Sequence, residues 1–255
     1  MPAQHKNLYP QLLAARQHGE KRLAILLDPD KLPPDRLEQT VALAAESGVH
    51  YFFVGGSLIV NDRLDDLLSD IRRRCDIPLV LFPGNSFQLS YRADAILLLS
   101  LISGRNPELL IGQHVIAAPF LKISPLEIIP TGYMLIDGGV PTAVQYMSNT
   151  LPIPAGKDDI AVCTAMAGEM LGLKMIYLEA GSGASQPVAP AMIEAVRNVL
   201  DIPLIVGGGI RTPEQATAAW GAGADVLVVG NAAERSPELI RDIMQAIPRS
   251  GPGNQ

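Results

Sequence analysis

The chain has 255 residues, of which 48% are hydrophobic, and a formal net charge of −6 at pH 7. This length and apolar content suit one (β/α)₈ domain, which has roughly 250 residues. No block of Lys and Arg is concentrated enough to follow a phosphate backbone, which excludes nucleic acid as a partner. No stretch approaches the ~18 uninterrupted apolar residues of a membrane-spanning helix. Cys75 and Cys163 lie far apart without metal-ligand spacing, and we interpret them as reduced thiols of a cytoplasmic protein.

Eight short apolar runs follow a segment that we predict to be an N-terminal helix over about residues 8–18. Each run is nearly continuous in Val, Ile and Leu, which is typical of parallel strands buried on both faces. In chain order the runs are 22–28, 51–56, 78–84, 95–100, 132–138, 175–181, 203–209 and 226–231.

Helical patterns separate most of these runs, at 34–47, 61–74, 158–171, 190–200, 213–221 and 237–247. Strands that alternate with helices form βαβ units, and eight such units predict closure into a (β/α)₈ TIM barrel. We therefore expect one barrel domain over residues 1–255, with a frayed tail at about 250–255.

Two connections depart from the regular alternation. Residues 85–94 separate the third and fourth runs, and ten residues barely admit a parallel crossover that contains a helix. We predict that the third helix is missing or replaced by extended chain, which leaves a gap in the helical wall. The second is the long stretch 139–174, which begins as a polar loop of the kind that often covers a site.

Glycine-bearing segments end the last three strands, where this fold often builds a phosphate site. A residue without Cβ lets backbone N–H groups approach an oxyanion, and a following helix N-terminus adds partial positive charge. The candidates are Gly208, Gly209, Gly230 and Asn231. One such run is equally well explained as a tight turn, but three runs in the expected loops favour a phosphate site. Arg211 either meets an anion or closes the seventh helix.

Polar residues also end the first two strands. Asp28 follows the first run and Ser57 follows the second, so a barrel places them side by side at one rim. One carboxylate, one hydroxyl, waters and substrate phosphate oxygens make a suitable Mg²⁺ shell. Asp28 and Ser57 are also good capping residues for a turn and a helix, and spacing alone favours that interpretation.

Glu179 lies inside an otherwise apolar strand, two residues after Tyr177, so both side chains point to the same side. A buried carboxylate needs a partner, which is either a substrate hydroxyl or a basic side chain within the barrel. The functional interpretation is favoured because the strand runs directly into the predicted phosphate loop.

Familiar motifs occur in order along nearly the whole chain: LLDPDK (26–31), FFVGGS (52–57), LFPGN (81–85), IPTGYMLIDGG (129–139), IYLEAGSGA (176–184), VGGGIR (206–211) and VVGNAAE (228–234). Together with the DD..A..A.A.E.LG pattern at 158–172, they resemble the geranylgeranylglyceryl phosphate synthase family, which is related to the bacterial heptaprenylglyceryl phosphate synthases. The GYMLIDGG and LEAGSGA segments are most similar to the second subgroup of the family, which includes bacterial members.

The resemblance implies a prenyltransferase that joins sn-glycerol 1-phosphate to a polyprenyl diphosphate by an ether bond, on a barrel whose third helix is replaced. It implies Mg²⁺ at Asp28 and Ser57, and Glu179 as the catalytic residue that orients the glycerol hydroxyl. The residues implied to hold glycerol phosphate are Tyr177, Leu178, Glu179, Ala180, Gly181, Ser182, Gly183, Gly208, Gly209, Gly230 and Asn231.

The resemblance also implies a donor and partners. We expect geranylgeranyl diphosphate, with its tail in an apolar groove along the third to fifth strands. Leu109 and Leu110 lie where a side chain could end this groove, although a core role explains them better. A homodimer or hexamer and transient contact with a membrane surface are further expectations.

Two alternatives remain open. One is another phosphate-binding barrel enzyme that acts on a sugar phosphate or a similar small substrate. The other is a non-catalytic barrel that binds a phosphorylated metabolite.

Overall fold

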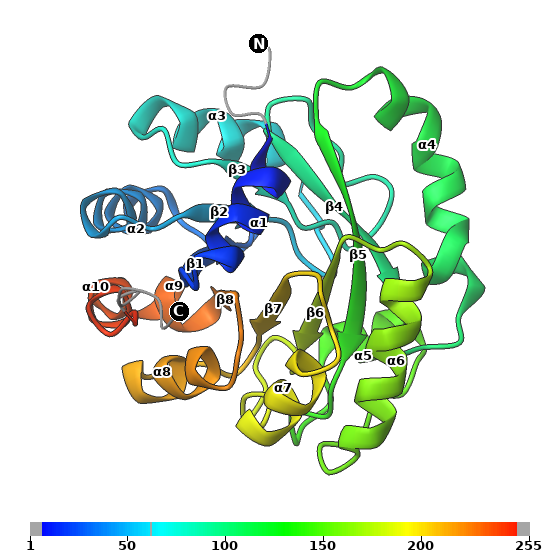
Figure 1. The fold of residues 1–255 in the computed structure, drawn as a ribbon. Helices are drawn as coiled ribbons and strands as arrows, with labels where there is room; N and C mark the ends of the chain where they lie inside the picture. Colours follow the sequence, from blue (N-terminus) through cyan, green and yellow to red (C-terminus); the bar gives the residue numbers. More distant parts are fainter. Residues whose placement is uncertain (1–6, 62, 249–255) are drawn as a thin grey trace.

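The computed structural model of the chain describes residues 7–61 and 63–248. Eight parallel strands pair in chain order and close into a barrel, because the last strand also pairs with the first. Helices surround this barrel (Figure 1). The strands are β1 (Arg22–Leu27), β2 (Tyr51–Val54), β3 (Leu79–Leu81), β4 (Ala95–Leu101), β5 (Glu127–Leu135), β6 (Met175–Glu179), β7 (Leu204–Gly207) and β8 (Val226–Val229). The predicted (β/α)₈ barrel is confirmed.

Most helices lie where the apolar spacing predicts them. These are α1 (Leu8–Gln17), α2 (Pro34–Ser47), α3 (Leu64–Arg74), α6 (Asp158–Met170), α7 (Pro190–Arg197), α8 (Pro213–Gly221) and α10 (Glu238–Gln245). The structure adds a π-helical turn, η1 (Glu108–Gly112), and the helices α4 (Gln113–Ile123), α5 (Ala143–Ser148) and α9 (Asn231–Arg235). The predicted frayed tail lies outside the described residues.

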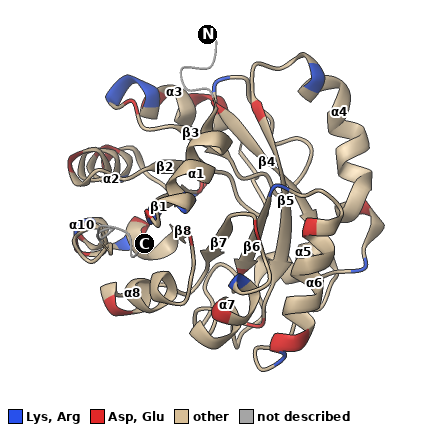
Figure 2. Cartoon of the chain, viewed as in Figure 1, with Lys and Arg blue, Asp and Glu red and all other residues tan. Residues whose placement is uncertain are grey.

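The apolar runs are continuous because both faces of each strand are buried. In β8, Val226 and Val228 belong to the cluster inside the barrel, whereas Leu227 and Val229 belong to the cluster between the barrel and the helices. Figure 2 shows the charged residues mainly on the outer helices and loops, with the strands largely in tan.

Helix α1 closes the N-terminal end of the barrel. Leu8 and Leu12 pack into the interior cluster, and Figure 1 shows α1 over the middle of the barrel. The Glu127 carboxylate, at the start of β5, accepts hydrogen bonds from the backbone N–H groups of Leu8 (2.5 Å) and Tyr9 (3.0 Å). A carboxylate is stabilising at a helix N-terminus because free N–H groups point toward it. The site must therefore open at the other end.

The connection between β3 and β4 contains no helix, as predicted, and all of its residues are described. Side-chain hydrogen bonds fix it instead. The Gln88 amide donates to the backbone oxygen of Gly56 (2.8 Å) and accepts from the N–H of Gly84 (3.0 Å). These bonds hold the connection against the end of β2.

Several strands are shorter than their predicted runs, and β5 also begins earlier than predicted. The expected run was 132–138, but β5 begins at Glu127 and ends at Leu135. Its first half carries Glu127, Pro130 and Thr131, which interrupt the apolar pattern. Pairing with β4, from Ala95 opposite Glu127 onward, maintains the strand there.

No helix within residues 7–61 and 63–248 is both long and apolar enough to cross a membrane.

Candidate active site

A polar pocket of about 700 Å³ lies at the C-terminal ends of the strands. It is bordered by residues that follow β1, β2, β6, β7 and β8, because parallel strands in a barrel all end at the same rim. Most of the predicted site residues line it: Asp28, Ser57, Glu179, Gly181, Ser182, Gly183, Gly208, Gly209, Gly230 and Asn231.

Three predicted binding residues do not line this pocket. Leu178 faces the outer cluster toward the helices, and the Ala180 N–H donates to the backbone oxygen of Gly207 (3.0 Å). Tyr177 is fully buried inside the barrel, beneath the pocket. For all of the predicted residues, whether or not they line the pocket, the role in glycerol phosphate binding stays a prediction.

Positive φ angles at the glycine turns bring the loops after β6 and β7 close together. Gly208 has φ 80°, and a Cβ there would lie 2.4 Å from Glu179 Oε1 and 2.7 Å from the Gly181 nitrogen. Gly209 has φ 74°, and a Cβ there would lie 2.7 Å from the backbone of Gln186. L-residues with side chains rarely adopt this conformation and cannot approach so closely. Glycine at these positions is therefore required by the packing of the loops.

Side chains fasten the loop after β6. Arg211 donates to the backbone oxygens of Ser185 (3.1 Å) and Ala184. Asn231 Nδ2 donates to the Ser182 hydroxyl (2.9 Å). Arg211 therefore clamps the glycine loop, while its positive charge lies at the pocket wall.

Glu179 is 6% exposed and sits at the inner wall of the pocket. Its Oε1 accepts a hydrogen bond from the Gly181 N–H (2.7 Å). Burial raises the pKa of the Glu179 carboxyl, and the neighbouring Tyr177 hydroxyl and the Gly181 N–H oppose this shift. No salt bridge to Glu179 occurs among the described residues, so the alternative of a buried ion pair receives no support. The carboxylate can accept a hydrogen bond from a bound hydroxyl.

An aromatic cluster lies beside Glu179. The ring centroids of Tyr133 and Tyr177 are 5.3 Å apart, and those of Phe82 and Tyr177 are 5.4 Å apart. Such tilted and edge-on pairs are the preferred aromatic geometries. Phe82 and Tyr133 also line the pocket.

Asp28 and Ser57 line one side of the pocket, as the barrel arrangement predicts. Asp28 is 8% exposed, and its Oδ2 lies 2.6 Å from Lys31 Nζ. Oδ1 accepts the N–H of Asp30 (3.0 Å), so Asp28 does cap the turn. No group of three or more His, Cys, Asp or Glu in the described chain is placed to hold a metal ion. One carboxylate and one hydroxyl still fit Mg²⁺, which keeps several waters and binds substrate phosphates.

An apolar groove of about 410 Å³ joins this pocket. It runs where the helix between β3 and β4 is missing, beneath the 82–89 connection and beside η1 and α4. Its walls include Leu89, Ile96, Leu98, Leu99, Leu101, Leu109, Ala117 and Leu121. The pocket and the groove share Gly56, Ser57, Phe82, Tyr133 and Val144. Leu109 lines the groove, whereas Leu110 does not.

Two acidic residues of the pocket were missed by sequence reasoning. Glu234, on α9, accepts the Asp28 N–H through Oε1 (3.2 Å). Asp30 accepts the N–H groups of Val60 (2.6 Å) and Asn61 (3.3 Å), which fixes the loop after β2 at the pocket mouth. Asp30 lies in the motif LLDPDK and Glu234 in the motif VVGNAAE. The sequence therefore showed both acidic residues, but it did not show which groups they contact.

Structural comparison identifies close likenesses. A crystal structure of (S)-3-O-geranylgeranylglyceryl phosphate synthase from Thermoplasma acidophilum, in complex with substrate sn-glycerol-1-phosphate, matches with a TM-score of 0.90 and 35% identity over 95% of this chain and 99% of that one. A thiamine phosphate pyrophosphorylase from Pyrococcus furiosus, at a TM-score of 0.55 and 13% identity, covers 90% of this chain and 96% of its own, and shares the fold alone.

Sequence relatives agree with this likeness. A geranylgeranylglyceryl phosphate synthase of Chitinophaga pinensis is 51% identical over 97% of this chain and 98% of the relative. One from Thermococcus kodakarensis is 42% identical over 92% and 93%. The PcrB family model matches residues 16–247. With its barrel, its glycine turns and these matches, the chain belongs to the PcrB family.

Proposed function

We propose that this chain is a prenyltransferase of ether phospholipid synthesis, which joins sn-glycerol 1-phosphate to a polyprenyl diphosphate and releases diphosphate. One observation carries the proposal: a polar pocket with glycine turns shares lining residues with an apolar groove. A small phosphorylated acceptor fits the first and an isoprenoid tail fits the second. The relatives named above carry the name geranylgeranylglyceryl phosphate synthase.

The acceptor's phosphate is assigned to the glycine turns after β6, β7 and β8. Backbone N–H groups in such turns form a concave site for an anion, and the chain needs no lysine cluster to supply it. Gly183, Gly209 and Gly230 line the pocket at these three turns. The T. acidophilum structure, whose substrate is sn-glycerol-1-phosphate, supports this assignment by its likeness over 95% of the chain.

Glu179 is assigned to the reacting hydroxyl of glycerol. The Gly181 N–H holds its carboxylate at the wall of the pocket. In the reaction, the bond between the allylic carbon and the diphosphate oxygen breaks, and the electron pair leaves with diphosphate. The glycerol oxygen forms the new bond to that carbon, while Glu179 orients the hydroxyl and accepts its proton.

Asp28 and Ser57 are assigned to Mg²⁺ binding. When bound, Mg²⁺ neutralises charge on the departing diphosphate. Chelation should therefore abolish turnover, and added Mg²⁺ should restore it. Turnover that persists in excess chelator would contradict the metal requirement.

The groove is assigned to the prenyl tail, and geranylgeranyl diphosphate is the expected donor. The decisive assay incubates the protein with Mg²⁺, labelled sn-glycerol 1-phosphate and prenyl diphosphates of increasing length. A labelled product that extracts into organic solvent supports the proposal. Phosphate binding without turnover on any donor would favour the non-catalytic alternative, and the apolar groove argues against a sugar-phosphate enzyme.

The assembly expected is a homodimer or a hexamer. Several side chains of α4 are apolar and exposed, among them Val115, Phe120 and Ile123. Exposed apolar patches of this kind mark interaction surfaces. Light scattering should give a mass above that of one 27.2 kDa chain. Because the product is destined for a membrane, transient contact with a bilayer surface is also expected.

A further inference from the structure

The short helix α9 has side-chain contacts on both sides of the polar pocket. At its first residue, Asn231 Nδ2 donates to the Ser182 hydroxyl (2.9 Å), in the glycine loop assigned to the acceptor. Three residues later, Glu234 Oε1 accepts the backbone N–H of Asp28 (3.2 Å), on the side assigned to Mg²⁺ and diphosphate.

Helix α9 is anchored by the core rather than by these contacts. Ala233 is fully buried between the barrel and the helices. Its N–H donates to the Gly230 oxygen (2.8 Å), and a Cβ at Gly230 would lie 3.5 Å from the Leu26 side chain of β1. Residues 230–234 therefore form a fixed support against the end of β1.

The Asp28 main chain depends on that support. Asp28 lies just after β1, where the regular ladder hydrogen bonds stop. The carboxylate of Asp28 points into the pocket, where it meets the Asp30 N–H and Lys31. A hydrogen bond to the backbone N–H fixes the origin of that side chain without occupying either carboxylate oxygen.

We propose that Glu234 is a positioning residue, which fixes Asp28 at the donor side and, through α9, holds it in register with the acceptor loop. This role rests on the proposed function of Asp28. Residues that orient a metal ligand without touching the metal typically affect affinity or activity 10–100-fold. The chemical reason is that the two reacting partners must be aligned to within a fraction of an ångström.

The test compares Glu234→Ala, which removes the acceptor oxygen, with Glu234→Gln, which keeps an amide oxygen at the same place. Glu194→Ala, at an exposed position of α7, is the control. Two ligand affinities are measured by calorimetry without turnover: Mg²⁺ with inorganic pyrophosphate, and sn-glycerol 1-phosphate. Melting temperature is recorded for every variant.

We expect Glu234→Ala to weaken binding of Mg²⁺ with pyrophosphate by roughly 10–100-fold, with glycerol phosphate affinity changed less than about 2-fold. Glu234→Gln should retain most of the wild-type affinity for Mg²⁺ with pyrophosphate. Equal weakening of both ligands, or a Gln variant as poor as the Ala variant, would overturn the positioning role. Asp28→Asn separates the failure of the metal assignment from the failure of the positioning role. If Asp28→Asn leaves pyrophosphate binding intact, Asp28 does not bind Mg²⁺, and the positioning role of Glu234 fails as well. If only Asp28→Asn weakens binding, the positioning role alone fails.

Discussion

The chemical role proposed for Glu179 comes with a cost to stability. Burial raises the pKa of its carboxyl above the ordinary value, so the folded protein binds the proton more readily than the unfolded chain. The resulting stabilisation is complete below the ordinary pKa, and it is lost as pH rises through the raised pKa. Above the raised pKa, the ionised carboxylate is therefore held in the fold at the expense of stability.

Glu179→Gln should separate these two effects. The amide keeps the shape but is a far weaker base, so turnover should fall by roughly 10²–10⁴-fold. Above the raised pKa of Glu179, the melting temperature of the variant should stay equal or rise, because the variant buries no charge at this position. Assays of turnover and thermal unfolding on one preparation test both. Near-wild-type turnover would refute the catalytic role.

The pH profile provides a second check on the same group. Only the ionised carboxylate can accept the proton of glycerol, so kcat should decline as pH falls through the raised pKa of Glu179. That decline should be absent from the residual activity of Glu179→Gln. The profile is measured with both substrates saturating, and a decline that survives in the variant would assign it to another group.

Two glycines of the pocket predict different outcomes when replaced by Ala. At Gly208 a Cβ would meet Glu179 Oε1 at 2.4 Å, whereas at Gly183, also with positive φ, nothing lies within 4 Å. Gly183→Ala should cost about 1–2 kcal/mol of stability from backbone strain. Gly208→Ala should lose more stability and most of its turnover, because it displaces the carboxylate. Unfolding curves and kcat measure the contrast, and equal effects would contradict the packing argument.

Residues at the strand ends could be predicted from the sequence more readily than the side chains that contact them. Asp28, Ser57 and Glu179 could be predicted because barrel strands all end at one rim, which fixes the neighbours of each last residue. Glu234 could not, because its contact with Asp28 arises only when β8 pairs with β1. Periodicity within one segment contains no information about such closure.

At the level of elements, the groove wall formed by η1 and α4 offers a test of donor length. Leu109 and Leu110 are neighbours in η1 and both are half-buried, but only Leu109 lines the groove. Leu109→Trp should lower kcat/KM for geranylgeranyl diphosphate more than for shorter donors, because the larger ring fills the tail's space. Leu110→Trp is the control. Product analysis over a donor series measures the ratio, and equal effects of the two variants would exclude Leu109 from the groove's function.

The strand predictions were correct where both faces of a strand are buried. They were wrong where pairing with a neighbouring strand maintains a segment whose residues are partly polar. The apolar runs located all eight strands, since the faces toward the interior and the helices are both buried. The predicted start of β5 was wrong because the polar residues of its first half have hydrogen-bond partners. Glu127 accepts the N–H of Leu8 in α1, and the Thr131 hydroxyl donates to the Ile129 oxygen. The gap after β3 was predicted correctly, because its length alone limits what can fit.

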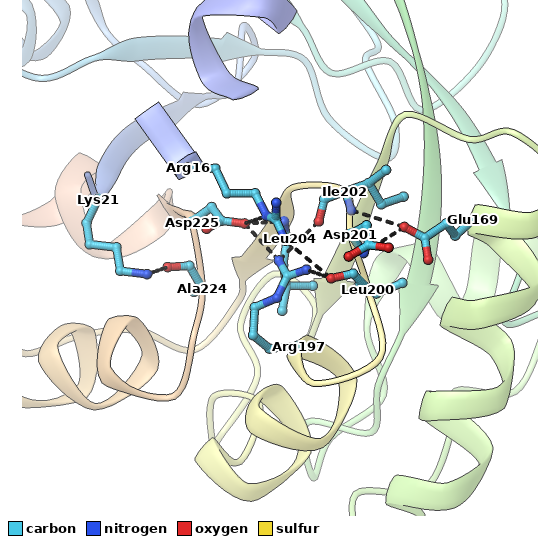
Figure 3. A network of polar contacts seen from close by, with 10 residues as sticks. All are labelled: Arg16, Lys21, Glu169, Arg197, Leu200, Asp201, Ile202, Leu204, Ala224 and Asp225. Atoms are coloured by element: carbon cyan, nitrogen blue, oxygen red, sulfur yellow. Dashed lines mark hydrogen bonds and ion pairs between the residues drawn. The ribbon is translucent and has the colours of Figure 1, made fainter. Parts of the chain in front are cut away.

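For the molecule as a whole, stability and chemistry belong to opposite ends of the barrel. Figure 3 shows the polar network at the N-terminal ends of β7 and β8, around the buried carboxylate of Asp225. Asp225 Oδ2 accepts the Leu204 N–H (2.8 Å) and pairs with Arg197 (3.0 Å), and Arg16 lies 3.9 Å away. The effects of a substitution on stability and on turnover can therefore be measured separately.

Asp225→Asn should destabilise the protein while leaving catalysis intact. The amide can still accept the Leu204 N–H but removes the carboxylate that pairs with the half-buried Arg197, a loss of about 3 kcal/mol. The melting temperature should fall by roughly 6–12 °C. Below the transition, kcat should equal that of the wild type. A reduced kcat at low temperature would contradict the separation of the two ends.

The absent helix between β3 and β4 has a consequence for how such a molecule can diversify. In the proposed reaction, a long hydrocarbon would leave the reaction centre sideways, through the barrel wall, along side chains of the 82–89 connection, η1 and α4. The residues proposed to carry the chemistry follow other strands: Asp28 after β1, Ser57 after β2 and Glu179 in β6. We therefore expect substitutions that lengthen or shorten the groove to change the preferred isoprenoid length without moving these residues.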